Sequence, residues 1–384
     1  MNNLIEKMLR MLAKELDISE EKYDKAVISY EAVGNYLNNN IEDSDIRIFS
    51  QGSFKLGTVI KPLNDEDDYD IDLVCLVGKN YNNPKDLKNE IGNVLKNSDR
   101  YCVMLEKNED GSYKEGKRCW TINYSDDAQY HMDILPAIAS SRYNTNKKLL
   151  ITNKDEVTGN YEFTSTNPEE YYSWFKGRMQ EEQRKLLLEY AQAKKLDIET
   201  VPEYKVKTTL QVAIQILKRY RDIMFQETPD DKPISIILTT ILASMYNGEG
   251  SVYELIKRFT EEFHLYIQKD KEGHFIIKNP VNPEENFADK WIIYPEREKA
   301  FFSFMQKLKQ DIIDNKLLIT GQLFEQAKTY KSLFGEKVVE RAYSSIGDET
   351  RILRESGELY VNSNGKLNSQ KDGNQVKGHN FHGN

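Results

Sequence analysis

The sequence predicts an α+β protein in which a mixed sheet with helices is followed by a helical region. Segments rich in aliphatic and β-branched residues concentrate before about residue 165. Beyond that point apolar residues recur at helical spacing. Because 384 residues exceed what one compact core usually holds, we expect two packed domains. We place them at 1–175 and 176–346 and expect a polar, mobile tail over 347–384.

The N-terminal region predicts both helices and strands. Amphipathic patterns predict helices over about 3–17 and 20–39. The pair Gly52-Ser53 in QGSFKLGTVI predicts a helix start with the serine near the cap. Apolar residues at i, i+4 and i+8 in PKDLKNEIGNVLKN predict a further helix. The predicted strands are 46–49, YDIDLVCLV (69–77), YCVMLEK (101–107), RCWTINY (118–124) and QYHMDILPAI (129–138).

The C-terminal half predicts a series of helices. The first of them, FKGRMQEEQRKLLLEYAQAKK, is heavily charged. From about residue 347 the chain is rich in Gly, Asn and Ser, a composition typical of a mobile tail. The other predicted helices are VKTTLQVAIQILKRYRDIMF, PISIILTTILASMY, SVYELIKRFTEEFHLYI, EREKAFFSFMQKLKQDIIDN and GQLFEQAKTYKSLF.

The net charge and hydropathy of the chain restrict the classes of binding partner that we expect. The net charge is −9, whereas proteins that track long nucleic acid rely on many Lys and Arg contacts to phosphate. The composition therefore favours small nucleotides over polymers. No stretch approaches the roughly 18 consecutive apolar residues of a membrane-spanning helix, and the N-terminus lacks a signal-peptide layout. We expect a cytoplasmic protein with no membrane partner.

Three acidic residues stand in apolar strands. Asp70 and Asp72 are two positions apart in YDIDLVCLV, so their side chains leave the strand on the same face. Asp133 is the one acid in the apolar strand HMDILPAI, and a buried charge there needs a partner. Alone, Asp70 and Asp72 would also fit an exposed strand face, and Asp133 would also fit a hydrogen-bonded structural acid.

Convergence of the three acids would require cations. Two carboxylates about 4 Å apart repel by about 4 kcal/mol at an effective dielectric near 20. Hard oxygen ligands select Mg²⁺ or Mn²⁺ over zinc. Two such ions can activate an attacking hydroxyl and neutralise a leaving pyrophosphate. Gly52-Ser53, at a predicted helix start 18 residues before Asp70, would suit a triphosphate, although it also fits a plain cap.

The order of these motifs resembles a known family. GSFKLGTVIKP, then DDYDIDLV, then HMDILPA, is similar to the Gly-Ser helix, Asp-x-Asp strand and third carboxylate of polymerase-β-type nucleotidyltransferases. More narrowly, the chain resembles the bacterial relatives of cyclic GMP-AMP synthase and oligoadenylate synthase, the CD-NTases of anti-phage (CBASS) operons. The segments TSTNPEEYYSWF, LQVAIQILKRYRDIMF, DDKPISIILTTILA and NPVNPEENFADKW extend the resemblance over about 45–345.

The resemblance implies a fold and a set of roles. It implies a polymerase-β-like lobe packed on an oligoadenylate-synthase-like helical lobe. Asp70, Asp72 and Asp133 would be catalytic and hold two Mg²⁺ ions, with Mn²⁺ as a substitute. Gly52 and Ser53 would bind donor phosphates. Two further nucleotide-binding residues would be Lys218 and Ser235, although Lys218 also fits a snorkelling surface lysine and Ser235 a plain helix-start serine.

The implied activity is synthesis of a cyclic di- or trinucleotide second messenger from NTPs, ATP among them, with release of pyrophosphate. The implied partners are a downstream effector that binds the product and an operon-encoded regulator. One alternative is a template-independent RNA or tRNA-end nucleotidyltransferase on the same fold, against which the acidic charge weighs. Another is a catalytically silent nucleotide-binding scaffold. Such scaffolds usually lack one of the three carboxylates, whereas this sequence has all three. His131, two residues before Asp133, would border the site or support it structurally.

Overall fold

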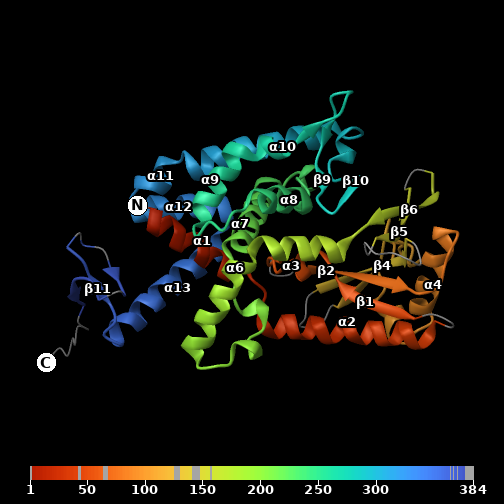
Figure 1. Cartoon of the computed structure of the whole chain (residues 1–384), viewed down its shortest axis with the longest axis horizontal. Coiled ribbons are helices and arrows are strands. Elements are labelled where there is room, and N and C mark those ends of the chain that lie inside the picture. Colours follow the sequence, from red (N-terminus) through yellow and green to blue (C-terminus); the bar gives the residue numbers. More distant parts are fainter. Residues whose placement is uncertain are drawn as a thin grey trace. The chain divides into compact units, whose positions relative to one another are not determined.

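The computed structural model describes residues 2–41, 45–63, 68–124, 130–140, 148–155, 158–363, 365, 367–369 and 371–376. Contacts group the chain into two compact units, one spanning Asp17–Asp314 and the other combining Met1–Leu16 with Asn315–Asn384. The larger unit contains the main sheet (Figure 1). Within the described residues no helix is both long enough and apolar enough to cross a bilayer.

Six of the described strands form the sheet of the larger unit. Five of them follow the order β1-β2-β4-β5-β6, and β3 pairs with β4. β2 and β4 run parallel, whereas the other neighbours are antiparallel. This mixed sheet confirms the predicted α+β class. The strands are β1 Ile46–Ser50, β2 Tyr69–Val77, β3 Trp120–Tyr124, β4 Tyr130–Ala139, β5 Leu149–Lys154 and β6 Tyr161–Thr166.

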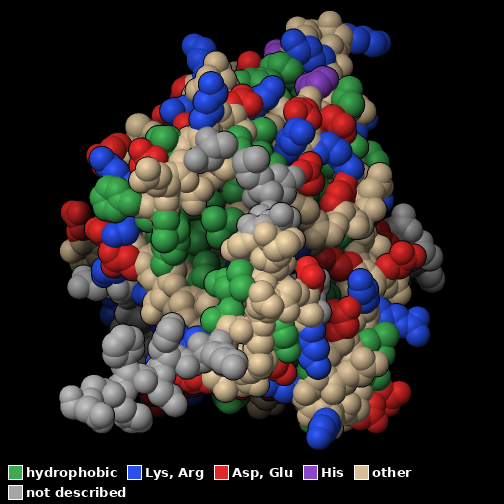
Figure 2. All heavy atoms as spheres, turned by 90° about the vertical axis from the view of Figure 1, so that its left-hand side faces the viewer, with side chains coloured by type: hydrophobic (Ala, Val, Ile, Leu, Met, Phe, Trp, Pro, Cys, Tyr) green, Lys and Arg blue, Asp and Glu red, His purple; other side chains and the backbone are tan. Residues whose placement is uncertain are grey.

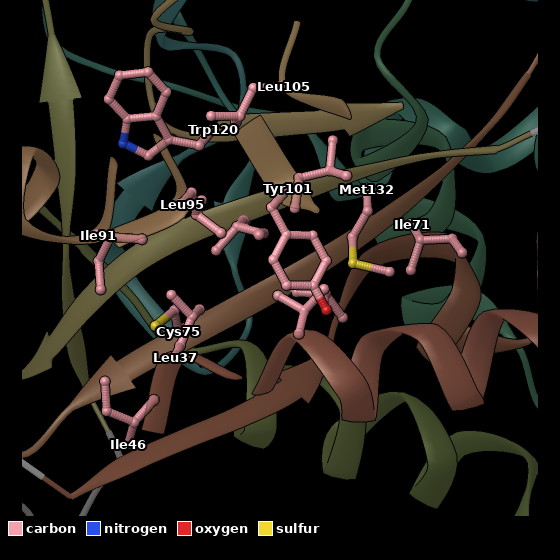
Figure 3. Close-up of a cluster of buried hydrophobic side chains, with 14 of the residues drawn as sticks. Leu37, Ile46, Ile71, Cys75, Ile91, Leu95, Tyr101, Leu105, Trp120 and Met132 are labelled. Atoms are coloured by element: carbon pink, nitrogen blue, oxygen red, sulfur yellow. The ribbon is translucent and has the colours of Figure 1, made fainter. Parts of the chain in front are cut away.

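Two helices cover one face of this sheet, which we call the closed face. They are α2 (Glu20–Asn40) and α4 (Pro84–Lys96), and α2 runs alongside the sheet in Figure 1. Their apolar sides and the alternate residues of β2, β3 and β4 form one buried cluster, because strand side chains alternate between faces. Residues of this cluster labelled in Figure 3 include Leu37, Ile71, Cys75, Ile91, Leu95, Trp120 and Met132.

The opposite face, which we call the open face, carries a much smaller apolar cluster. Its buried members come from β2, β4 and β5 and lie toward the ends of β2 and β4 that follow the acidic residues. Asp70, Asp72 and Asp133 precede this cluster on the same face. The cluster consists of Val74, Leu135, Ala137, Leu149 and Ile151.

One predicted strand is wrong. YCVMLEK forms the short helix α5 (Tyr101–Met104) instead, and only Leu105 and Lys107 make isolated bridges. The hydroxyl of Ser98 accepts a hydrogen bond from the backbone N–H of Tyr101 at 3.1 Å. Such local capping by serine favours a helical turn over the strand that the alternating pattern indicated.

Helices dominate the larger unit after β6. They surround α7, whose side chains Gln211, Gln215 and Lys218 donate hydrogen bonds of 3.0, 2.8 and 2.9 Å to backbone oxygens within 56–59. α7 therefore fastens the segment that leads from α3 (Gly52–Leu56) toward β2. The helices are α6 Pro168–Lys194, α7 Thr209–Met224, α8 Ser235–Met245, α9 Val252–Glu262 and α10 Pro295–Leu308. Short hairpins pair β7 Gln268–Lys269 with β8 Phe275–Ile276, and β9 Lys278–Asn279 with β10 Asn282–Asn286.

The smaller unit joins both ends of the chain. α1 (Asn2–Leu16) packs against α13 (Glu336–Glu355), where Ser345 Oγ donates to Glu15 Oε1 at 2.7 Å. The remaining elements are α11 Lys316–Thr320, α12 Leu323–Phe334, β11 Tyr360–Val361, β12 Leu367–Asn368 and β13 Asn374–Gln375. β11 pairs with both β12 and β13.

The segment predicted to be a tail and the predicted borders can be compared with the structure. Part of the predicted tail has secondary structure, because α13 continues to Glu355 and a three-stranded sheet follows. A polar composition does not show that backbone groups are paired between strands. Residues 377–384 lie outside the described part. Residues 1–16 and 315–346 join the smaller unit, and the predicted border at 175 falls inside α6. The division of 17–314 into two lobes stays a prediction.

Candidate active site

The three predicted carboxylates lie on the open face of the sheet. Asp70 and Asp72 leave β2 on one side because they are two residues apart in a strand. In the parallel register of β2 with β4, Asp72 lies opposite Asp133, and Asp70 lies opposite His131. Neighbouring strands run about 4.8 Å apart. The sheet thus places all three acids within two adjacent strands.

Asp70 and Asp133 each have a polar partner. His131 Nε2 forms an ion pair with Asp70 Oδ1. Thr121 Oγ1 of β3 donates a hydrogen bond of 2.6 Å to Asp133 Oδ1. His131 therefore borders the site, as its place in β4 indicated, and it contacts Asp70 directly. Thr121 was not singled out from the sequence, but alternation in RCWTINY puts it on the same face as Asp133.

The three carboxylates do not form one tight cluster. Of the described His, Cys, Asp and Glu residues, one trio has ligand atoms all within 4.8 Å of each other: Asp270, Glu272 and His274 in the β7–β8 hairpin. Asp270 Oδ1 there accepts the backbone N–H groups of Glu272 and His274, so this trio is a hydrogen-bonded turn. The strand register brings Asp70, Asp72 and Asp133 near one another, but their ligand atoms do not all lie within 4.8 Å. Their role as metal ligands stays a prediction.

Charge at the open face favours a cation. Burial and the carboxylates of Asp133 and Asp70 raise the pKa of Asp72 to about 7, although Lys218 and His131 oppose the rise. Burial also opposes ionisation of Asp70, but the hydrogen bond and charge of His131 outweigh it and lower the pKa of Asp70. Asp72 tends to stay protonated because the neighbouring carboxylates repel its charge. A hard divalent ion such as Mg²⁺ would neutralise this repulsion.

Gly52 and Ser53 meet the carboxylates at the start of α3. The backbone N–H of Gln51 donates to the carbonyl of Asp72 at 2.8 Å, which ties this turn to β2. Gly52 has a φ of 60°, a left-handed conformation that favours glycine. A Cβ at residue 52 would overlap Asp72 Oδ2. The sequence placed the serine near the cap; Gln51 is the N-cap and makes no side-chain capping bond.

Lys218 is buried rather than snorkelling at the surface. It lines the same cavity as Asp70 and Asp72, and its Nζ donates to the carbonyl of Thr58 at 2.9 Å. Burial, then the charge of Arg221, lowers the pKa of Lys218 to about 8, whereas nearby carboxylates oppose the fall. An anionic ligand beside this ammonium would stabilise its charged form and raise its pKa again. This geometry supports the phosphate-binding interpretation.

Ser235 leads to a residue that the sequence analysis missed. Ser235 is the first residue of α8, directly after the N-cap Ile234, and accepts a hydrogen bond of 2.6 Å from Arg221 Nη1. Arg221 is buried, and its other nitrogens bind Asp222 Oδ1. The available signal was the spacing of Lys218 and Arg221, which places both on one side of α7.

One cavity gathers most of the candidate residues. It has a volume of about 610 Å³, within the range of small-molecule sites. It lies between the open face of β2, α3 and the helices α7 and α8. Asp133 is not among its lining residues, although it lies opposite Asp72. The candidate residues that line it are Gly52, Ser53, Asp70, Asp72, Lys218 and Ser235.

Positive and negative side chains are mixed on the face of the molecule shown in Figure 2. Figure 2 shows Lys and Arg side chains interleaved with Asp and Glu side chains on one face of the molecule. On that face, the described residues form no continuous basic stripe of the kind that tracks a long polyanion.

Comparison with known proteins adds sequence-level evidence. Residues 4–178 match the model of the Second Messenger Oligonucleotide or Dinucleotide Synthetase domain (SMODS). A protein of Roseivirga ehrenbergii named c-di-GMP synthase is 29% identical over 360 residues, which cover 92% of this chain and 90% of the relative. Cyclic dinucleotide synthase CdnG of Bradyrhizobium diazoefficiens is 23% identical over 89% of this chain and 83% of its own.

Solved structures agree on the fold. The structure of B. diazoefficiens CdnG in complex with GTP matches with a TM-score of 0.69 and 19% identity, covering 90% of this chain and all of that chain. E. coli MS115-1 CdnC, solved as a complex with HORMA-deltaN, matches with a TM-score of 0.60 and 15% identity over 86% and 96% of the two chains. At these identities the likeness shows the fold.

Proposed function

We propose that the chain is a bacterial cGAS/DncV-like nucleotidyltransferase (CD-NTase), an enzyme that synthesises cyclic oligonucleotides, and that it joins two NTPs at the open face of its sheet. The ribose hydroxyl of one nucleotide attacks the α-phosphorus of the other, and pyrophosphate leaves. A second attack of the same kind closes the ring. The cyclic product then acts as a second messenger of anti-phage signalling.

One observation carries this proposal. The parallel register of β2 with β4 sets Asp72 beside Asp133 at the edge of a cavity that also holds Gly52, Ser53 and Lys218. Carboxylates for cations and donors for phosphate therefore occur side by side. A catalytically silent scaffold would not need to keep Asp72 half-buried beside Asp133 and Asp70, where burial and the two neighbouring carboxylates raise its pKa to about 7.

We assign roles by position. Asp70, Asp72 and Asp133 hold two divalent cations, Mg²⁺ or Mn²⁺, and Asp133 helps to take the proton of the attacking hydroxyl. When bound, such ions activate the hydroxyl and neutralise the leaving pyrophosphate. The backbone of Gly52, the hydroxyls of Ser53 and Ser235, and the ammonium of Lys218 hold the β- and γ-phosphates of the donor. Arg221 orients Ser235.

GTP is the substrate we propose to test first. The 29% identical relative is named c-di-GMP synthase, and CdnG was solved with GTP. ATP, expected from the sequence, is the second candidate. The HORMA partner of CdnC makes a protein regulator worth testing as well. The proposed site of action is the cytoplasm.

Incubation with the four NTPs, singly and in pairs, tests the activity. With Mg²⁺ present, we expect a phosphatase-resistant small product, identified by mass spectrometry, and pyrophosphate in stoichiometric amount. The matched control is the double variant Asp70→Ala with Asp72→Ala, which should stay folded and make no product.

Two outcomes would overturn the proposal. Product from a folded double variant would remove the carboxylates from the chemistry. Elongation of added RNA, with no small cyclic product from NTPs alone, would favour the template-independent polymerase that the same fold allows.

A further inference from the structure

A second cavity also borders α3. It has a volume of about 640 Å³ and is lined by β6, the starts of α6 and α8, and residues 279–297. It shares Gly52, Leu56, Lys232 and Ile236 with the first cavity, so the two spaces meet at the Gly-Ser turn. A reaction that joins two nucleotides needs two such spaces that meet where the bond forms.

Three cations in this second cavity form a group that we call the cation cluster: Arg118, Lys290 and Arg297. Burial, then the charges of Lys117, Arg118 and Arg297, lowers the pKa of Lys290. The charges of Arg118 and Arg297 act on Lys290 because all three side chains line the same cavity, and the opposing charge of Asp289 does not reverse the fall. They are therefore suited to an anionic ligand.

The cations of the cluster make weak interactions with neighbouring side chains. Arg118 Nε donates to Asn153 Oδ1 at 3.3 Å, and the guanidinium of Arg297 lies 4.6 Å from the ring centroid of Tyr294. No described carboxylate forms a salt bridge with Arg118, Lys290 or Arg297.

The acids of the same cavity are engaged elsewhere. Glu284 pairs with Lys148, outside the lining. Asp289 Oδ1 accepts the backbone N–H of Lys290 at 2.7 Å. Glu285 accepts from Asn279 Nδ2 at 2.8 Å, and burial raises its pKa, although the charge of Arg118 reaches it. The charges of Glu285 and Asp289 therefore offset part of the positive charge of the cluster, but neither carboxylate forms a salt bridge with it.

We propose that Arg118, Lys290 and Arg297 hold the 5′-triphosphate of the attacking nucleotide in the first bond-forming step. This inference rests on the proposed function. In that step the oxygen of the attacking ribose hydroxyl bonds to the donor α-phosphorus, and the bond from that phosphorus to the β-phosphate oxygen breaks. Pyrophosphate leaves with the electron pair, and the hydroxyl proton goes to Asp133. The attacking nucleotide keeps all three of its phosphates, which need cations of their own.

Ring closure places no such demand on the cluster. In the linear dinucleotide the remaining triphosphate is the new leaving end, so it occupies the first cavity with Ser53 and Lys218. The nucleoside that now attacks has its 5′-phosphate inside the linkage. The cation cluster therefore serves the first step and is dispensable in the second.

The test uses the full chain with Arg118→Gln, Lys290→Gln and Arg297→Gln combined. Lys278→Gln is the matched control, since Lys278 is an exposed cation of β9 outside the cavity lining. With GTP and Mg²⁺ we expect the KM of the triple variant to rise about tenfold or more, as loss of charge-assisted hydrogen bonds predicts. Closure of added linear 5′-pppGpG should stay within about twofold of the wild type, and the melting temperature should not fall.

Binding gives a second readout. A GTP analogue with an α,β-methylene bridge should bind the wild type with two equivalents and the triple variant with one, measured by calorimetry. An unchanged KM and two equivalents in the triple variant would overturn the inference, and so would equal loss of both steps. Failure of the proposed function looks different: the wild type itself would form neither linear nor cyclic product from any NTP.

Discussion

The two faces of the β2–β4 pair do opposite things with the same strands. On the closed face, Ile71 and Leu73 are fully buried under α2 and α4. On the open face, the neighbouring Asp70 and Asp72 line a cavity and repel one another. Stability thus comes from one face, and the proposed chemistry uses the other. Alternation in a strand lets one sequence supply both without compromise at any single residue.

The largest expected effect comes from the closed face. Leu73→Ala should lower the free energy of unfolding by about 2–5 kcal/mol, because it leaves a cavity under α2 and α4. Product formation per folded molecule should persist at temperatures where the variant remains folded. Chemical denaturation with parallel activity assays would measure both. Val103→Ala, at an exposed position of α5, is the control and should change stability by less than about 0.5 kcal/mol.

A change at the open face should reduce activity more than stability. Gly52→Ala introduces a Cβ against Asp72 Oδ2 at a residue with φ of 60°. Displacing the carboxylate and the turn should reduce kcat/KM about a hundredfold, as a shift of about 1 Å does in a catalytic site. Gly177→Ala in α6, where a Cβ meets open space, is the matched control. Equal activity of both variants would separate the Gly-Ser turn from the chemistry.

The open face should also make metal-free stability depend on pH. The pKa of Asp72 rises from 3.8 to about 7 on folding, so between these values the folded state binds one proton more than the unfolded state. The free energy of unfolding therefore falls as the pH rises through this window. His131, whose pKa is raised by Asp70, adds a fall in the same direction at higher pH.

Thermal melts from pH 4 to 8 with chelator would show this fall as a loss of a few degrees. Mg²⁺, which binds the ionised carboxylates, should restore more stability at pH 8 than at pH 5. Asp72→Asn should flatten the curve below pH 7. A melting temperature that rises steadily from pH 4 to 7 in the metal-free wild type would contradict the mutual repulsion of the acids.

The smallest effect is expected for Thr121 of β3, which lies on the open face beside Asp133. Thr121→Val keeps the shape of the side chain in β3 but removes the hydrogen bond to Asp133 Oδ1. We expect a reduction of about fivefold in kcat, the value of one ordinary hydrogen bond, with little change in stability. Thr121→Ser, which keeps the hydroxyl, should recover most of the rate. If it does not, the methyl packing of Thr121 matters more than its hydroxyl.

Periodicity in the sequence predicted the elements that carry the site. β2 and β4 were found because long aliphatic runs leave little choice but a buried strand, and the acids within them stood out for the same reason. It missed β5, β6 and α13, and of these β6 has a weak pattern. YEFTST in β6 is polar and half-buried, and the turn at Ser98 converted an alternating segment into α5. Tertiary pairing, not local preference, made β6 a strand.

The sequence by itself determined the class of the fold, the face shared by Asp70 and Asp72, and the chemistry that their oxygens allow. Those are local properties, set by side-chain type and a period of two residues. Only the tertiary structure decided that Asp133 lies opposite Asp72, that Arg221 reaches Ser235, and that Arg118, Lys290 and Arg297 line one cavity. Each of these joins segments far apart in the chain, and their proximity depends on how buried surfaces pack, which no local pattern records.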